Sequence, residues 1–121
     1  MSKLRLLIAD DEEGIRESLK LLLEREYEVT LADNGQEAWE WLSRDGFDLA
    51  VLDIKMPKLD GLEILKRMKR QRIETPVLML TAYQSVELAK EAVKLGAVDY
   101  VTKPFDSTQV LDAIHDVVAK K

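Results

Sequence analysis

The sequence predicts a doubly wound α/β fold, in which a parallel sheet is covered by helices on both faces. Two observations predict it. Short apolar, β-branched runs alternate with segments of helical spacing, and the alternation occurs five times along the chain. Alternation of this kind is typical of parallel strands joined by right-handed helical crossovers. Because 121 residues is the length of one ordinary domain, we expect a single domain over residues 1–121.

The predicted strands are short and differ in polarity. They are Leu4–Ala9, Glu28–Ala32, Leu49–Leu52, Val77–Leu80 and Val98–Thr102. The first and third are the most uniformly apolar, which favours a central place in the sheet with both faces buried. The second contains EVTLA and is more polar, which suits an edge.

The helical segments between the strands carry start and stop signals. Capping-box spacing occurs at three starts, namely Asn34 with Glu37, Asp60 with Glu63, and Asp106 with Gln109. Gly46 and Gly96 follow helical patterns, so we expect both to be left-handed C-caps.

Composition and charge exclude several classes of protein. No apolar run approaches the ~20 residues that span a bilayer, and the N-terminus lacks the long apolar stretch of a signal peptide. The absence of cysteine excludes a disulfide scaffold and fits a cytoplasmic protein. The net charge is −5, and the basic run Lys66–Arg72 falls in an amphipathic helical pattern, which predicts a solvated helix face. We therefore expect a cytoplasmic protein that contacts neither membrane nor nucleic acid directly.

Chemically active side chains stand where four of the predicted strands end. Asp10 and Asp11 follow the first strand, Asp53 the third, Thr81 the fourth and Lys103 the fifth. Each alone has an ordinary explanation, such as acids at a helix start or a lysine at the surface. Because the carboxyl ends of parallel strands share one edge, where ligands of open α/β sheets bind, the set together predicts a functional site.

The chemistry of this set suits phosphoryl transfer. Three neighbouring carboxylates repel one another and attract a cation, and hard oxygen ligands suit Mg²⁺. A carboxylate is a nucleophile toward phosphorus in aspartyl-phosphate ATPases. Positive charge from the metal and Lys103, with the Thr81 hydroxyl, would stabilise the oxygens of the transferring group.

The blocks LLIADDEEGIR, LAVLDIKMPKLDGLEIL, PVLMLTAY and LGAVDYVTKPF together resemble the receiver domain of two-component response regulators, over essentially the whole chain. The resemblance implies a flavodoxin-like (βα)5 fold with strand order 2-1-3-4-5. It also implies a phosphoacceptor switch, in which Asp53 takes a phosphoryl group from a sensor histidine kinase or a histidine phosphotransferase. Such a domain supports its own phosphorylation and autodephosphorylation but is not otherwise an enzyme.

The resemblance also assigns the metal and the switch. Mg²⁺, for which Mn²⁺ or Ca²⁺ substitutes in vitro, would be bound directly by Asp11, Asp53 and the backbone carbonyl of Lys55, with Asp10 acting largely through water. Thr81 and Lys103 would bind phosphoryl oxygens, and Lys103-Pro104 is expected to be cis.

The implied output is a change at the face formed by the fourth helix, fifth strand and fifth helix. Thr81 would move toward the phosphoryl group and Tyr100 would swing inward, so that a downstream protein or effector domain binds differently. Lys55 and Tyr83 would set the phosphoryl lifetime. We expect a monomer or a weak, phosphorylation-dependent dimer.

A docking surface for the kinase or phosphotransferase is implied by single-domain regulators of the sporulation type. The matching positions are Gly14, Ile15, Pro104 and Phe105. Ile15 also fits the apolar stripe of the first helix, so a core position is equally consistent with the pattern.

Other functions compete with this interpretation. A haloacid-dehalogenase-like phosphatase would need an acid at the position of Lys55, and a flavodoxin-like cofactor carrier would need a phosphate loop where ADDEEG stands. A receiver-shaped interaction module that is never phosphorylated is a third alternative. The Met1 start and Lys121 end favour a stand-alone chain, against the alternative of a longer regulator cut before its effector domain.

Overall fold

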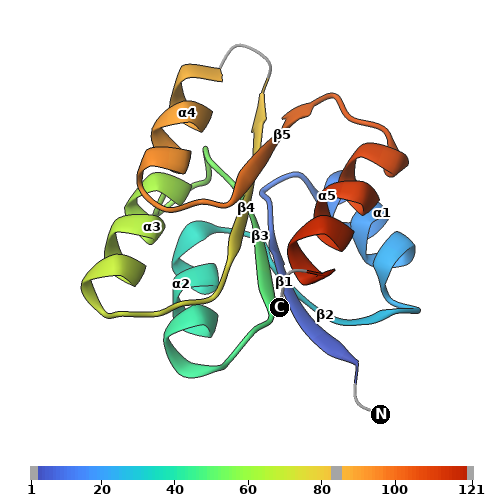
Figure 1. Cartoon of the computed structure of the whole chain (residues 1–121), viewed down its shortest axis with the longest axis horizontal. Coiled ribbons are helices and arrows are strands. Elements are labelled where there is room, and N and C mark those ends of the chain that lie inside the picture. The colour runs from blue at the N-terminus through green and yellow to red at the C-terminus, as the bar shows by residue number, and fades with distance from the viewer. Residues whose placement is uncertain (1–2, 83–85, 120–121) are drawn as a thin grey trace.

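The computed structural model describes residues 3–82 and 86–119, and it contains the predicted alternation of strands and helices. The elements are β1 (Leu4–Ala9), α1 (Glu13–Leu23), β2 (Tyr27–Ala32), α2 (Gly35–Arg44), β3 (Leu49–Asp53), α3 (Gly61–Arg70), β4 (Val77–Ala82), α4 (Val86–Lys94), β5 (Asp99–Lys103) and α5 (Ser107–Ala119). The strands form one parallel sheet of order β2-β1-β3-β4-β5 (Figure 1). This order confirms the predicted fold, with β1 and β3 inside the sheet and β2 at an edge.

Helices cover both faces of the sheet. In Figure 1, α1 and α5 lie on one side, and α2, α3 and α4 lie on the other. Two apolar clusters fill the interfaces, and alternate strand residues divide between them: Leu6 and Ile8 belong to the α1–α5 side, and Leu7 and Ala9 to the other. Burial on both faces explains why the central strands are continuously apolar.

The strands reach further toward the site than their apolar runs suggest. β3 includes Asp53, which pairs with Leu80, and β4 continues to Ala82, so that Thr81 pairs with Thr102. The backbone ladder needs no apolar side chain, so it continues past the residues that the periodicity identifies. The phosphoacceptor candidate and the hydroxyl candidate are therefore held inside regular strands.

The predicted N-caps are present at the helices that follow β2, β3 and β5. The side chains of Asn34 and Asp60 accept hydrogen bonds from the backbone N–H of the residue three positions on, at 2.9 and 2.8 Å. Asp106 and Gln109 form a reciprocal capping box with two bonds of 2.9 Å.

Of the two predicted C-caps, one is correct and one is wrong. Gly96 has φ +116°, as a glycine cap requires. α2 instead ends at Arg44 and continues through an extended Asp45 with φ −119°, so Gly46 is not a left-handed cap. The extended Asp45 already leads the chain out of α2, and in the loop that follows the Gly46 carbonyl accepts a hydrogen bond from the Arg5 side chain at 3.0 Å.

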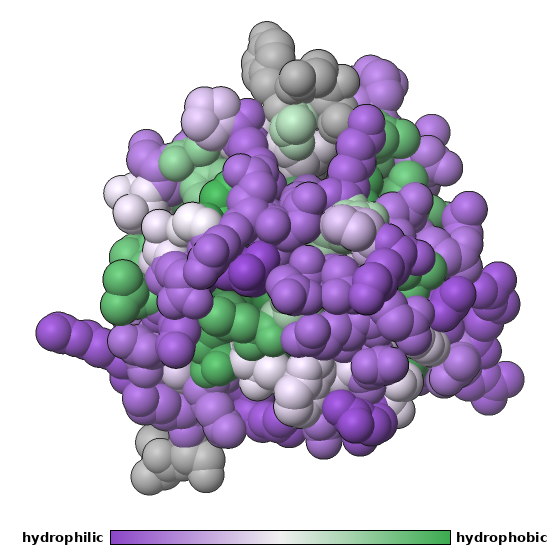
Figure 2. All heavy atoms as spheres, turned by 180° about the vertical axis from the view of Figure 1, so that it is seen from behind, coloured by the Kyte–Doolittle hydropathy of each residue, from purple (hydrophilic) through white to green (hydrophobic). Residues whose placement is uncertain are grey.

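The face of the molecule seen from behind is mainly polar. Figure 2 shows hydrophilic side chains over most of the back of the molecule, with smaller apolar patches between them. In the expected solvated face of α3, Arg67 and Arg70 lie 3.6 and 3.0 Å from Glu63. None of the helices in residues 3–82 and 86–119 combines the length and apolarity that a membrane span requires.

Candidate functional site

The candidate site lies at the carboxyl edge of the sheet. Among the described residues, the buried polar side chains are Asp10, Asp53 and Thr81, which are 0, 6 and 1% exposed. They come from the ends of three different strands, and all three were predicted as site residues. Burying a charged group is costly unless a partner or a metal compensates it, so this concentration marks a site and not an ordinary strand end.

Lys103 is the cation of the site, and its ammonium group lies among the carboxylates. Its Nζ lies 2.8 Å from Oδ2 of Asp10, 3.0 Å from Oε1 of Glu12 and 3.2 Å from Oδ2 of Asp53. The contact with Asp10 is an ion pair without the alignment of a hydrogen bond, and Oδ1 of Asp10 accepts the backbone N–H of Glu12 at 2.9 Å. One lysine thus joins three carboxylates from two segments of the chain, the one after β1 and the end of β3.

The electrostatics of the edge favour protonation of Asp53. Burial raises the pKa of Asp53 to about 6, the Asp10 charge adds to the rise, and Lys103 opposes it only in part. For Lys103, burial lowers the pKa, but its carboxylate partners outweigh this and raise the pKa above its ordinary value. Four carboxylates of this cluster, those of Asp10, Asp11, Glu12 and Asp53, thus share one lysine.

The carboxylates are close enough to hold a metal ion. One oxygen from each of Asp10, Asp11, Glu12 and Asp53 lies within 4.8 Å of the others. These are hard donors, Oδ2 of Asp10 is buried without an aligned hydrogen bond, and the cluster carries excess negative charge. The donor set thus fits a hard divalent cation.

A cavity of about 240 Å³ opens above the carboxylates. It is lined by Asp11, Glu12, Asp53, Ile54, Lys55, Thr81, Ala82 and Lys103. Thr81 and Lys103 therefore lie beside Asp53 as predicted, and the exposed Lys55 stands at the cavity wall. The other predicted lifetime residue, Tyr83, lies outside the described residues.

The loop after β3 fixes the position of Asp53. The N–H of Ile54 donates to the Leu80 carbonyl at 3.0 Å, and the N–H of Gly61 donates to the Ile54 carbonyl at 2.7 Å. A Cβ at position 61 would lie 2.9 Å from the carbonyl oxygen of Asp53. Glycine is therefore required here, because α3 begins directly against the backbone of the site.

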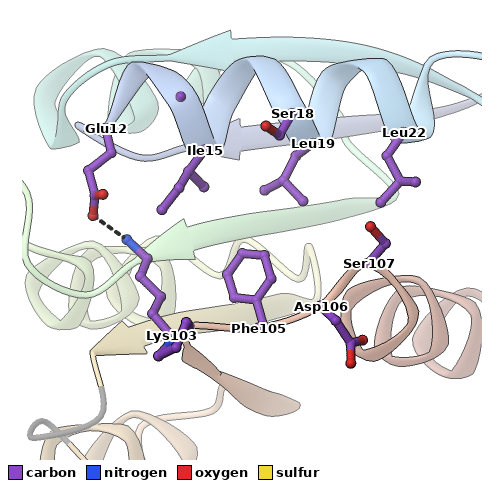
Figure 3. Close-up of a pocket in the computed structure, with 11 residues that line it drawn as sticks. Glu12, Ile15, Ser18, Leu19, Leu22, Lys103, Phe105, Asp106 and Ser107 are labelled. Atoms are coloured by element: carbon purple, nitrogen blue, oxygen red, sulfur yellow. Dashed lines mark hydrogen bonds and ion pairs between the residues drawn. The ribbon is translucent and has the colours of Figure 1, made fainter.

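The predicted docking residues lie together in a groove of about 680 Å³ between α1 and the segment that joins β5 to α5. Gly14, Ile15, Pro104 and Phe105 all line it. In Figure 3, Ile15 and Leu19 point from α1 toward the side of the groove that carries Phe105. Ile15 is half-buried and also packs against the apolar core, so its core interpretation is confirmed and its docking role stays a prediction. The Lys103-Pro104 bond is cis, as expected.

Tyr100 lies away from the Asp53 cavity. It is partly buried, packs against the core on the side of α2, α3 and α4, and pairs in β5 with Met79 of β4. It belongs to the face formed by α4, β5 and α5, as predicted.

The sequence interpretation missed Glu12. Four successive acids after β1 offered a signal, but the direction of each side chain depends on how α1 begins. Glu12 is the N-cap residue of α1 and makes no side-chain cap bond. Glutamate is an uncommon N-cap, and here its carboxylate reaches across to Lys103.

Comparison with known proteins agrees with this geometry. The family model of the response regulator receiver domain matches residues 6–115. The uncharacterized transcriptional regulatory protein YkoG of Bacillus subtilis is 42% identical over 115 residues, covering 94% of this chain and 50% of that protein. The transcriptional regulatory protein FixJ of Bradyrhizobium diazoefficiens is 40% identical over 118 residues, covering 97% and 58%. The structure of the Francisella response regulator 1452 receiver domain has a TM-score of 0.90 at 34% identity, with 98% of each chain covered.

The match is to one part of the curated relatives. The chain spans about half the length of the first curated relatives it matches. The sheet, of order 2-1-3-4-5, holds four features at one edge. They are the acidic residues after β1, a buried aspartate that ends β3, a hydroxyl in β4 and a lysine that ends β5. The chain belongs to the family of response regulator receiver domains, which are the signalling domains of two-component systems.

Proposed function

We propose that this chain is a single receiver domain over residues 1–121 and that Asp53 is its phosphoacceptor. The observation that carries the proposal is the position of Asp53, 6% exposed at the end of β3, in a cavity and 3.2 Å from Lys103. A carboxylate oxygen of Asp53 attacks the phosphorus of a phosphohistidine on a sensor histidine kinase or phosphotransferase. The P–N bond breaks, its electron pair stays on the imidazole, and an acyl phosphate forms on Asp53.

The acidic cluster supports Mg²⁺ as the proposed cofactor. Asp11, Asp53 and the backbone carbonyl of Lys55 would ligate it, with Asp10 acting through water, and Mn²⁺ or Ca²⁺ would substitute in vitro. When bound, the ion supplies positive charge that offsets both the carboxylate repulsion and the charge of the transferring group. A metal of this kind accounts for the excess negative charge that Lys103 leaves uncompensated.

Two side chains of the cavity would bind the phosphoryl oxygens. Lys103 supplies an ammonium group and Thr81 a hydroxyl, and both line the cavity beside Asp53. Lys55, at the cavity wall, and Tyr83 would control the access of water and hence the lifetime of the acyl phosphate.

The proposed output is a shift between two states of the face formed by α4, β5 and α5. Movement of Thr81 toward the phosphoryl group leaves space that Tyr100 fills from β5. A downstream protein or an effector domain that prefers one state then senses phosphorylation. The relatives named transcriptional regulators support an effector domain as one form of this output.

The donor protein is proposed to dock in the groove that contains Ile15 and Phe105. Its apolar lining adjoins the Asp53 cavity through Glu12 and Lys103, so a helix seated there would bring its histidine near Asp53. We place this exchange in the cytoplasm and propose a monomer or a weak, phosphorylation-dependent dimer.

Intact mass spectrometry after incubation with acetyl phosphate tests the phosphoacceptor. We expect one added phosphoryl group that requires Mg²⁺ and that is absent from Asp53→Asn. Because acetyl phosphate replaces the kinase, the test does not depend on identifying a partner. A folded wild-type protein that gains no mass would contradict the proposal and favour the unphosphorylated interaction module.

A further inference from the structure

Glu12 is an acidic side chain of the site to which the proposed function gives no task. From the N-cap of α1, its Oε1 lies 3.0 Å from Nζ of Lys103 (Figure 3). The Glu12 side chain is 60% exposed, whereas that of Lys103 is 14% exposed. Since Glu12 makes no cap hydrogen bond to α1, its carboxylate serves Lys103 and not the helix.

Three carboxylates surround the ammonium group of Lys103, which donates hydrogen bonds to Glu12 and Asp53 and forms an ion pair with Asp10. An ammonium group has three N–H donors, and carboxylates of Asp10, Glu12 and Asp53 lie within 2.8 to 3.2 Å of Nζ. A phosphoryl oxygen that approaches Nζ competes with these three carboxylates for the positive charge of Lys103. Asp10 and Asp53 are buried, and Glu12 is the partner whose side chain already reaches solvent.

Glu12 and Lys103 also separate the two cavities of this edge. Of the described residues, these two line both the Asp53 cavity and the larger groove between α1 and α5. Their ion pair thus forms part of the wall between the groove and the phosphoacceptor. An anion that enters the Asp53 cavity meets this pair directly.

We propose that Glu12 is a positioning residue that holds Lys103 in the unphosphorylated protein and is displaced by the incoming phosphoryl group. The inference rests on the proposed function of Asp53. Breaking the pair in advance makes the ammonium available and speeds phosphorylation. The contact is exposed at the Glu12 end, where ion pairs are weak, so the expected change is on the order of twofold to fivefold.

The experiment compares three variants with the wild type. Glu12→Gln removes the charge, and Glu12→Asp keeps the charge but shortens the side chain so that it loses the contact with Lys103. Glu13→Gln is the matched control, because Glu13 is an exposed acid in the first turn of the same helix. The rate of phosphoryl uptake from acetyl phosphate is measured by intact mass at saturating Mg²⁺.

We expect both Glu12 variants to be faster than the wild type by that factor and Glu13→Gln to be unchanged. An equilibrium titration with beryllofluoride and Mg²⁺, in which the phosphoryl mimic adds to Asp53 without turnover, should show tighter binding in both Glu12 variants. These results together would support displacement of Glu12, because a merely structural role would not tighten the binding of a phosphoryl mimic.

Two outcomes would overturn the inference while leaving Asp53 as the phosphoacceptor. In one, the wild type is phosphorylated at Asp53 and the Glu12 variants react at the same rate. In the other, Glu12→Gln and Glu13→Gln are equally fast and Glu12→Asp equals the wild type, which shows that only net charge matters. No uptake by the folded wild type would instead overturn the proposed function and this inference with it.

Discussion

At the scale of single residues, the site is governed by an excess of negative charge around one lysine. At Asp53 burial adds to the effect of this charge: burial raises its pKa to about 6, and the neighbouring Asp10 charge contributes to the rise. In the unfolded chain the pKa of this carboxyl returns to about 3.8. The charged form of Asp53 is therefore less favourable in the folded protein than in the unfolded one, and the site opposes folding when no metal is bound.

Replacing Asp53 with Asn should stabilise the metal-free protein in a manner that depends on pH. Because the folded pKa is raised, the contribution of Asp53 to stability is fully present below about pH 3.8 and is lost as pH rises through about 6. The variant should thus equal the wild type near pH 4 and exceed it at pH 7. Each pH unit between the two pKa values corresponds to about 1.4 kcal/mol, which limits the gain to about 3 kcal/mol.

Urea unfolding with a metal chelator between pH 4 and pH 8 measures this difference. Asp112→Asn, at an exposed position of α5, controls for the loss of one negative charge and should follow the wild type. If the free energies of unfolding of the wild type and Asp53→Asn change with pH in the same way across this range, the prediction is wrong.

The sequence was sufficient for the site residues that end strands and insufficient for Glu12. The positions of Asp53 and Lys103 follow from the strands they end, and that of Asp10 from the strand it follows, since parallel strands share an edge. The rule does not extend to Glu12, which directly follows Asp11. There the start of α1 sets the direction of the side chain. Only coordinates show that it turns toward a lysine 91 residues away.

At the scale of elements, the sequence signals for helix ends were correct where a local side chain forms hydrogen bonds with the backbone. They were wrong where a contact from a distant part of the chain forms those hydrogen bonds. The caps at Asn34 and Asp60 hold because each side chain accepts from its own helix. Gly46 is not a left-handed C-cap because the extended Asp45 before it already leads the chain out of α2, toward a loop in which Arg5 of β1 binds the Gly46 carbonyl. The strand ends shift for a related reason, since ladder hydrogen bonds continue beyond the apolar residues.

Asp60→Ala should destabilise the protein by about 1 kcal/mol. The Asp60 side chain accepts the Glu63 N–H at 2.8 Å, and loss of such a cap leaves a helix donor without its partner. Asp60→Asn retains an acceptor oxygen and should lose much less. Thermal unfolding of both variants measures the difference, and equal destabilisation of the two would show that the carboxylate charge, not the cap, matters here.

At the scale of the whole molecule, the topology explains why the site exists only in the folded chain. Asp10 and Asp11 follow β1, whereas Asp53 ends β3, and the sheet brings these strands side by side. The polarity of the strands predicted that β1 and β3 are central and that β2 lies at an edge, whereas the full order was implied by the resemblance to receiver domains. The extent to which each carboxylate is buried was not predictable, since burial depends on how the loop before α3 closes over the strand.

A site assembled from distant segments should couple Mg²⁺ binding to folding. An ion that binds the folded chain alone stabilises it by about 2.7 kcal/mol at a concentration of one hundred times Kd. We therefore expect Mg²⁺ to raise the melting temperature of the wild type with concentration, and NaCl at equal ionic strength to raise it much less. Asp11→Asn should lose most of the effect, and Glu13→Gln should keep it.

The same titration distinguishes metal binding from simple relief of repulsion at Asp53. Without metal at pH 7, Asp53→Asn should melt above the wild type, because it lacks the unfavourable charge. As Mg²⁺ is added, the wild type gains more than the variant, since it retains the proposed ligand, and the gap between the two narrows. If the gap stays constant while both curves rise, Mg²⁺ stabilises the protein at some place other than this edge, and the proposed set of ligands is wrong.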